Sequence, residues 1–237
     1  MFRLSICGLS PSEKRKALNT NHLKPHSLPR LQLALDGTRE QSLAVLEHIA
    51  PLVDIIEIGT PLLYREGIHV AAEIRKLYPN MLLLADLKIM DAGEEEANIA
   101  FDMGCNFVTV LGVTQDKTIQ GVVASAKRHG GEVVVDMMQV ADVVERGHHL
   151  LAFGVDYLCV HTAFDQQEIE TPLATLRRLR KGLTDAPVAV AGGVGLPTID
   201  SILVMKPSIV VVGGAITRAA DPAAVTHRLR DRMSVPQ

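Results

Sequence analysis

Residues 81–93 read MLLLADLKIMDAG, an apolar run that ends on Asp86 and Lys88, with Asp91 just beyond. A short, continuous apolar run of this kind predicts a buried strand of a parallel sheet. Strands that close a buried core do not usually finish on charged residues, because an unpaired charge is costly to bury. We therefore expect these three charges to have a function.

Similar apolar runs lie on both sides of this stretch, and the starts of neighbouring runs are roughly 21 to 31 residues apart. This spacing accommodates one strand, one helix and two short turns. Segments with helical spacing of apolar residues lie between the runs, such as GIHVAAEIRKLY and TIQGVVASAKRHG. The other runs are LQLALD, DIIEIG, FVTVLG, EVVVDMM, YLCVHT, VAVAGGV and IVVVGGAI.

Eight buried strands that alternate with amphipathic helices predict an α/β protein with a closed (β/α)8 barrel, the TIM barrel. We place this barrel domain at residues 30–237. A doubly wound open sheet is the alternative architecture. It is disfavoured because no GxGxxG phosphate fingerprint follows the first strand, where the chain reads ALDGTRE.

Residues 1–29 differ from this pattern and are predicted to be a disordered N-terminal extension. The segment holds five basic residues against the single acid Glu13, and it carries three prolines without a periodic apolar face. A start codon placed too early and a transit peptide are the alternatives.

The composition of the chain favours a small molecule as its partner. With 237 residues and a formal net charge of -3, the protein lacks the basic excess that nucleic-acid binding needs. Its cysteines, Cys7, Cys105 and Cys159, are too few and too scattered for a disulfide framework or a metal cluster. No apolar run approaches the about 20 residues that a membrane helix requires. We therefore expect a reduced, cytoplasmic protein.

Polar residues end most of the apolar runs, and in a (β/α)8 barrel the carboxyl ends of the strands carry the chemistry. Taken singly, each has an ordinary explanation, such as a helix-capping aspartate, a core histidine or a turn glycine. Together they would place five carboxylates around one mouth, where a cation, a substrate or both must balance them. The candidates are Asp36, Glu57, Asp86, Lys88, Asp91, Asp136 and His161, with the pairs Gly192–Gly193 and Gly213–Gly214 after the last two strands.

Two sets of these residues, a pair of carboxylates and the glycines, each predict a bound ligand. Glu57 and Asp86 come from neighbouring strands and can reach one ion, and two carboxylates that leave room for water and substrate oxygens suit Mg²⁺ better than Zn²⁺. The backbone N–H groups of Gly193, Gly213 and Gly214 lie where barrels hold a phosphate, in the loops after strands seven and eight. The pattern predicts a magnesium site and a phosphorylated substrate.

With these residues in place, the sequence resembles the 3-hexulose-6-phosphate synthase family within the orotidine-monophosphate decarboxylase suprafamily. The resemblance covers about Leu31 to Met233, and DxKxxD by itself marks only the suprafamily. The matching runs, in the order of that family, are LQLALD, EIGTPL, LADLKIMDAG, VTVLG, VDMM, GVDYLCVHT, VAVAGGV and VVVGGAIT.

The 3-keto-L-gulonate-6-phosphate decarboxylases are the nearest related family, and this chain departs from them at three places. Where they carry a segment of the type HRSRD, the chain reads HTAFD, with Phe164 in place of the second arginine. It has Asp136 where they usually have Glu, and Gly213-Gly214 where they have glycine-arginine. All three departures favour the synthases.

The resemblance implies an aldehyde-lyase of the aldolase type, which adds formaldehyde to D-ribulose 5-phosphate through a 1,2-enediolate. This is a step of the ribulose monophosphate pathway of one-carbon and carbohydrate metabolism. The implied cofactor is Mg²⁺, or Mn²⁺ in its place, on Glu57 and Asp86. The other implied roles are charge balance for Lys88, proton transfer for His161, hydroxyl binding and orientation of Lys88 for Asp36, a second polar anchor for Asp136, and formaldehyde or water binding for Thr162.

Asp91 lies past the end of its strand, where we expect it to point away from its own barrel mouth. The resemblance implies that this aspartate enters the active site of a partner subunit, so that a homodimer is the catalytic unit.

Three other functions remain open at this point. The decarboxylase reaction is one. A phosphopentose epimerase or isomerase is disfavoured, because its usual metal site needs more histidines at strand ends than the single His161. A non-catalytic phosphate-binding barrel would have no use for Lys88 beside two metal carboxylates.

Overall fold

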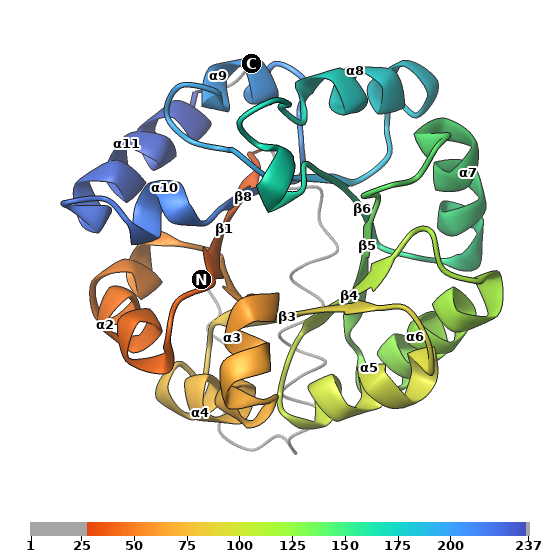
Figure 1. The fold of residues 1–237 in the computed structure, drawn as a ribbon, viewed down its shortest axis with the longest axis horizontal. Coiled ribbons are helices and arrows are strands. Elements are labelled where there is room, and N and C mark those ends of the chain that lie inside the picture. The colour runs from red at the N-terminus through yellow and green to blue at the C-terminus, as the bar shows by residue number, and fades with distance from the viewer. Residues whose placement is uncertain (1–27, 236–237) are drawn as a thin grey trace, which may run out of the picture.

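The computed structural model describes residues 28–235, which form a closed barrel of parallel strands inside a ring of helices (Figure 1). Each strand pairs with the next, and β8 pairs with β1. The predicted (β/α)8 barrel is therefore confirmed, and the open sheet is wrong, because its first and last strands would not pair. The strands are β1 (Arg30–Leu35), β2 (Ile55–Ile58), β3 (Leu82–Ile89), β4 (Phe107–Leu111), β5 (Glu132–Asp136), β6 (Tyr157–His161), β7 (Val188–Ala191) and β8 (Ile209–Val212).

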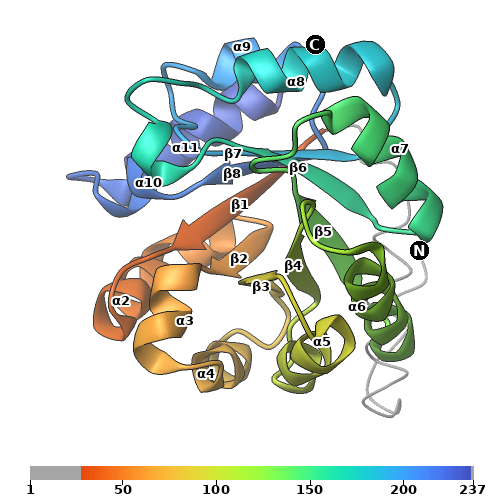
Figure 2. The same ribbon diagram turned by 45° about the vertical axis from the view of Figure 1, so that its right-hand side comes forward.

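The helices lie outside the strands in both views, Figure 1 and Figure 2. Side chains at their starts accept hydrogen bonds from free backbone N–H groups, as Thr38 does for Gln41 at the start of α2 and Asp142 for Glu145 in α7. No helix in the described part of the chain is long and apolar enough to span a membrane. The helices are α2 (Arg39–Ile49), α3 (Thr60–Glu66), α4 (His69–Leu77), α5 (Gly93–Asp102), α6 (Asp116–His129), α7 (Val143–Phe153), α8 (Leu173–Gly182), α9 (Ile199–Leu203), α10 (Gly214–Thr217) and α11 (Pro222–Met233), with 3₁₀ turns η1 (Ala50–Leu52) and η2 (Phe164–Gln166).

Alternation of side chains along the strands divides the core into two parts. Outward-facing residues such as Leu33 pack in one large cluster with the helices. Inward-facing residues such as Ala34, Leu84 and Val134 form a second, smaller cluster that fills the barrel. Side chains two positions apart on a strand share a face. The polar residues that stand two positions after Ala34, Leu84 and Val134 therefore lie at the carboxyl-terminal mouth of the barrel, above this apolar cluster.

The extension predicted for residues 1–29 lies outside the described residues except for Leu28 and Pro29. These two line a hollow of about 440 Å³ at the amino-terminal floor of the barrel, beside Arg30. The Arg30 guanidinium is buried and lies 5.6 Å from the ring centre of Phe107 and 5.3 Å from that of Tyr157. The floor is therefore closed by packing around an arginine, and the predicted chemistry lies at the other end.

Candidate active site

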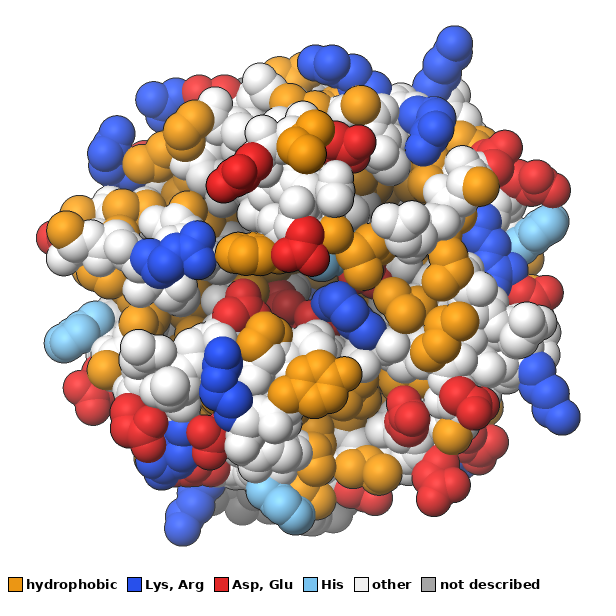
Figure 3. Space-filling view, viewed as in Figure 1, with side chains coloured by type: hydrophobic (Ala, Val, Ile, Leu, Met, Phe, Trp, Pro, Cys, Tyr) orange, Lys and Arg blue, Asp and Glu red, His pale blue; other side chains and the backbone are white. Residues whose placement is uncertain are grey.

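Figure 3 looks onto the carboxyl ends of the strands and shows a hollow at the centre, in which acidic side chains gather beside a basic one. The strand ends supply these groups as the sequence predicts. Asp36, Glu57, Asp86, Lys88 and His161 act on one another electrostatically, so they share one site.

Glu57 is buried in this cluster and is 8% exposed. Its Oε2 atom accepts a hydrogen bond of 2.6 Å from Nε2 of Gln32, which faces the same interior from β1. Burial, followed by the charge of Asp86, raises the pKa of Glu57 to about 8. The negative charge of Glu57 and Asp86 is therefore not fully balanced by the cations around them.

Asp86 is held by hydroxyl groups from both neighbouring elements. Thr109 Oγ1 of β4 donates to Oδ1 over 2.8 Å, and Thr60 Oγ1 at the start of α3 donates to Oδ2 over 2.9 Å. Lys88 Nζ also contacts Oδ2. These donors fix the carboxylate in place, which is what a rigid binding site requires.

An irregularity at the end of β3 positions Lys88. The register with β4 shifts between Ala85 and Ile89, and Lys88 has a positive φ of 48°. A bulge of this kind turns a side chain to a new direction and is common at barrel rims. The backbone N–H of Lys88 donates to Thr109 Oγ1 over 2.8 Å, which stabilises the strained conformation.

Lys88 lies between two carboxylates. Its ammonium contacts Asp86 and is 3.7 Å from Oδ2 of Asp136. Burial alone would lower the pKa of Lys88, but the two aspartates outweigh it and raise that pKa. Lys88 therefore stays protonated at neutral pH.

Asp136 and His161 form a hydrogen-bonded pair on β5 and β6. His161 Nδ1 lies 2.7 Å from Oδ2 of Asp136, and the backbone N–H of Met138 donates to Oδ1 over 2.9 Å. Burial by itself would raise the pKa of Asp136, but the hydrogen bond and charge of His161 and the charge of Lys88 lower it. Burial would likewise lower the pKa of His161, and Asp136 outweighs this and raises it. Asp136, predicted only as a polar anchor, is thus also the partner that orients His161.

The glycine pairs lie at the mouth beside this cluster. Gly192 and Gly193 both have positive φ, 86° and 68°, which only glycine adopts readily. A side chain on Gly192 would overlap the carbonyl oxygen of Thr162, so β7 can leave the barrel close to β6 only with glycine here. Gly213 precedes α10, and its Cα faces Asp36: a Cβ there would lie 3.6 Å from Oδ2 of Asp36.

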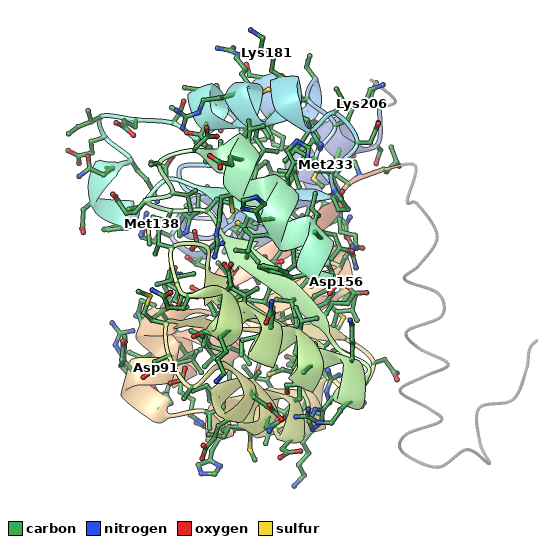
Figure 4. The ribbon with its side chains drawn as sticks, turned by 90° about the vertical axis from the view of Figure 1, so that its right-hand side faces the viewer. Asp91, Met138, Asp156, Lys181, Lys206 and Met233 are labelled. Atoms are coloured by element: carbon green, nitrogen blue, oxygen red, sulfur yellow. The ribbon has the colours of Figure 1, made fainter. Side chains whose placement is uncertain are left out.

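Two of the predicted site residues, Asp91 and Thr162, make no hydrogen bond or ion pair with this cluster among the described residues. Asp91 is exposed, and its Oδ1 accepts a hydrogen bond of 2.7 Å from the N–H of Ala92. Figure 4 places it on the mouth side of the barrel, on the side of Met138 and away from Asp156. Thr162 is buried and its N–H donates to Ala191 over 3.2 Å, continuing the ladder between β6 and β7. Alternation with His161 turns the Thr162 side chain away from the His161 face.

Glu57 and Asp86 are the two carboxylates from which a magnesium site could be built. Within residues 28–235, no three acidic, histidine or cysteine side chains are grouped as a complete metal site. A cation here would need water and substrate oxygens to complete its ligands, which is usual for Mg²⁺. Glu57 and Asp86 are acceptor-only oxygen donors, and their shared excess of negative charge is what a divalent cation would neutralise. The residues therefore fit Mg²⁺ held by two carboxylates.

Three supporting residues were missed in the sequence. Gln32 and Thr109 face inward by the same alternation that marks Ala34 and Phe107, so the period of two along the strands could have found them. Thr60 begins a helix and carries no such signal, because its contact with Asp86 depends on how α3 lies against β3.

Comparisons with known proteins find relatives of this chain over most of its length. Residues 29–229 match the model of the Orotidine 5'-phosphate decarboxylase / HUMPS family. A 3-hexulose-6-phosphate synthase of Bacillus subtilis (strain 168) is 40% identical over 202 residues, which cover 84% of this chain and 96% of the relative. The crystal structure of 3-hexulose-6-phosphate synthase from Salmonella typhimurium has 42% identity and a TM-score of 0.84, and the match covers 86% of this chain and 98% of that one.

A more distant solved structure shares the fold. The 3-keto-L-gulonate-6-phosphate decarboxylase of Vibrio cholerae O1 biovar El Tor is 24% identical with a TM-score of 0.77, over 89% of this chain and 99% of that one. This similarity shows that the two proteins share the barrel fold.

Proposed function

The chain belongs to the Orotidine 5'-phosphate decarboxylase / HUMPS family, and we propose that it catalyses the reaction of a 3-hexulose-6-phosphate synthase. In this reaction formaldehyde adds to D-ribulose 5-phosphate through a 1,2-enediolate. The observation that supports it most is the continuous series of contacts from Asp86 through Lys88 and Asp136 to His161. This series provides a fixed positive charge and a proton acceptor in one site, as enediolate chemistry requires.

His161 removes the proton from C1 of the sugar phosphate. Asp136 is ionised and accepts only, so Nδ1 of His161 carries the proton of their hydrogen bond and Nε2 is left as the base. The raised pKa of His161 makes it a stronger base than a free imidazole. Asp136 also stabilises the imidazolium once the proton has been taken.

Lys88 balances the negative charge that develops on the enediolate. Its ammonium is already placed between two carboxylates, so little reorganisation is needed during the reaction. Mg²⁺ on Glu57 and Asp86 would supply Lewis-acid polarisation of the two sugar oxygens. Asp36 lies at the rim beside Gly59 and Gly213, where it can accept a hydrogen bond from a substrate hydroxyl.

The direct test is an assay of the purified protein with ribulose 5-phosphate, formaldehyde and Mg²⁺. Phe164, which is 72% exposed in the loop after β6, supplies no charge for a substrate carboxylate. We therefore expect kcat/KM for formaldehyde condensation to exceed that for decarboxylation of 3-keto-L-gulonate 6-phosphate by about 100-fold or more, the size of losing a charged contact and its hydrogen bonds. A higher value for the decarboxylation would assign the chain to the alternative function.

A second prediction concerns the pH dependence. Asp136→Asn keeps an acceptor for Nδ1 of His161 but removes the negative charge, so the pKa of His161 should fall. Because the neutral imidazole is the active form, kcat/KM rises as pH passes upward through this pKa, and the variant's acid limb should move about one unit lower. Its maximal rate should fall by about 10²-fold, since the base is weaker. An acid limb that stays in place would show that another group titrates.

The proposal includes a homodimer in the cytoplasm, in which each subunit lends Asp91 to its partner. Exposed apolar side chains flank Asp91: Met90 is 54% exposed and Val113 is 43% exposed. Their loops are joined by a hydrogen bond of 2.6 Å from Thr114 Oγ1 to the carbonyl of Met90. A second copy packed on these side chains would bury them, and a two-fold arrangement would make the exchange of Asp91 reciprocal.

A further inference from the structure

Arg218 is a charged side chain at the mouth that the sequence pattern did not single out. It directly follows α10, and its backbone N–H donates to the carbonyl of Gly214 over 3.1 Å. The residue is exposed, and among residues 28–235 its guanidinium has neither a carboxylate partner nor a hydrogen bond. A cation is thus left free beside the glycine loops.

The guanidinium lies directly over Gly214. A Cβ built on Gly214 would overlap Cζ and Nη2 of Arg218 and would lie 2.8 Å from Nη1. Residues four apart share one face of a helix, and long side chains lean toward the helix N-terminus. The arginine therefore folds back over the start of α10, and it fits there because residue 214 has no side chain.

This position faces the same space as Asp36. Burial and the charge of Asp86 raise the pKa of Asp36, and Arg218 is one of the cations that oppose this rise. Lys88 is engaged by aspartates, and Arg65, which also lies beside Asp36, donates to the carbonyl oxygens of Asp36 and Gly37. Arg218 is thus available to an incoming anion.

We propose that Arg218 is a further substrate-binding residue, whose guanidinium binds the phosphate of the sugar phosphate beside the backbone N–H groups of Gly213 and Gly214. A planar guanidinium presents several N–H donors in the fork that phosphate oxygens match, and it keeps its charge at any working pH. The inference rests on the proposed function, which supplies the phosphorylated substrate.

The phosphate is remote from the carbon that loses its proton, so this contact is made equally in the ground state and the transition state. Such an interaction lowers KM and leaves kcat unchanged. Arg218 therefore differs from His161 and Lys88 in its kinetic signature.

The experiment compares the wild type with Arg218→Ala, Arg218→Lys and a matched control, Arg228→Ala. Arg228 is an exposed arginine of α11. We expect Arg218→Ala to raise KM for ribulose 5-phosphate by about tenfold, with kcat within about twofold. The inhibition constant of inorganic phosphate should rise by a similar factor. Arg218→Lys should recover part of the loss, and Arg228→Ala should match the wild type.

Calorimetric titration of ribulose 5-phosphate keeps this inference separate from the proposed function. If the wild type binds the sugar phosphate but does not condense it with formaldehyde, the proposed function fails, and weaker binding by Arg218→Ala still supports the role of Arg218. If Arg218→Ala binds as tightly as the wild type, or if Arg228→Ala loses as much affinity, the role of Arg218 is overturned whatever the activity.

Discussion

Excess EDTA should reduce condensation of formaldehyde with ribulose 5-phosphate by about 10³-fold or more, and Mg²⁺ or Mn²⁺ should restore it. The reason is the buried pair Glu57 and Asp86, whose mutual repulsion shows a shortage of positive charge at the base of the mouth. A metal that polarises two substrate oxygens supplies several kcal/mol, which corresponds to a loss of this size. Full turnover in EDTA would mean that the carboxylates are structural.

Glu57→Gln separates metal binding from folding. The glutamine keeps an oxygen that can accept the hydrogen bond from Gln32, and it removes one of two buried negative charges. The metal-free variant should therefore be at least as stable to heat as the metal-free wild type, while its activity falls as in EDTA. Added Mg²⁺ should raise the melting temperature of the wild type but not of the variant. Loss of thermal stability in the variant would instead indicate that Glu57 holds the fold.

Asp91→Ala and His161→Ala homodimers should each lose about 10³-fold or more in kcat while remaining folded, because each removes one group of the proposed shared site. Mixing the two under exchange conditions should restore activity. In the heterodimer one site lacks both groups, and the other pairs the intact His161 of the Asp91→Ala subunit with the intact Asp91 of the His161→Ala subunit. Each heterodimer should reach about half of the wild-type activity, because one of its two sites is complete.

The exposed position of Asp91 makes this test decisive. Its only hydrogen bond in the described chain is to the N–H of Ala92, so its removal should leave the barrel intact. If Asp91 acts within its own subunit, each site of the mixed dimer carries one defect and activity stays at the level of the single variants. The control is Asp165→Ala mixed with His161→Ala, where Asp165 is a solvent-exposed aspartate in the loop after β6. By either model each Asp165→Ala subunit keeps one intact site whether its partner is mutated at His161 or not, so this mixture should keep its activity and gives the activity expected for one complete site per heterodimer.

The barrel and most of the strand-end residues could be predicted from the amino-acid sequence. Continuous apolar runs predict buried strands, and their regular spacing with helical segments between them predicts parallel pairing. In a barrel, a polar residue two positions after the last inward-facing apolar residue of a strand must lie at the mouth. This rule predicts the positions of Asp36, Glu57, Asp86, Asp136 and His161. This works because alternation along a strand is a local property of the backbone.

Which of these groups touch could not be predicted in this way. The contact of Lys88 with Asp136 depends on the shifted register between β3 and β4 and on the positive φ of Lys88. The hydrogen bond from His161 to Asp136 depends on the pairing of β5 with β6, and the cover of Gly214 by Arg218 depends on the direction of α10. A sequence pattern reports the neighbours of a residue along one element, whereas a site is built from contacts between elements. Those contacts are set by register, bulges and helix direction, which form only when the barrel closes.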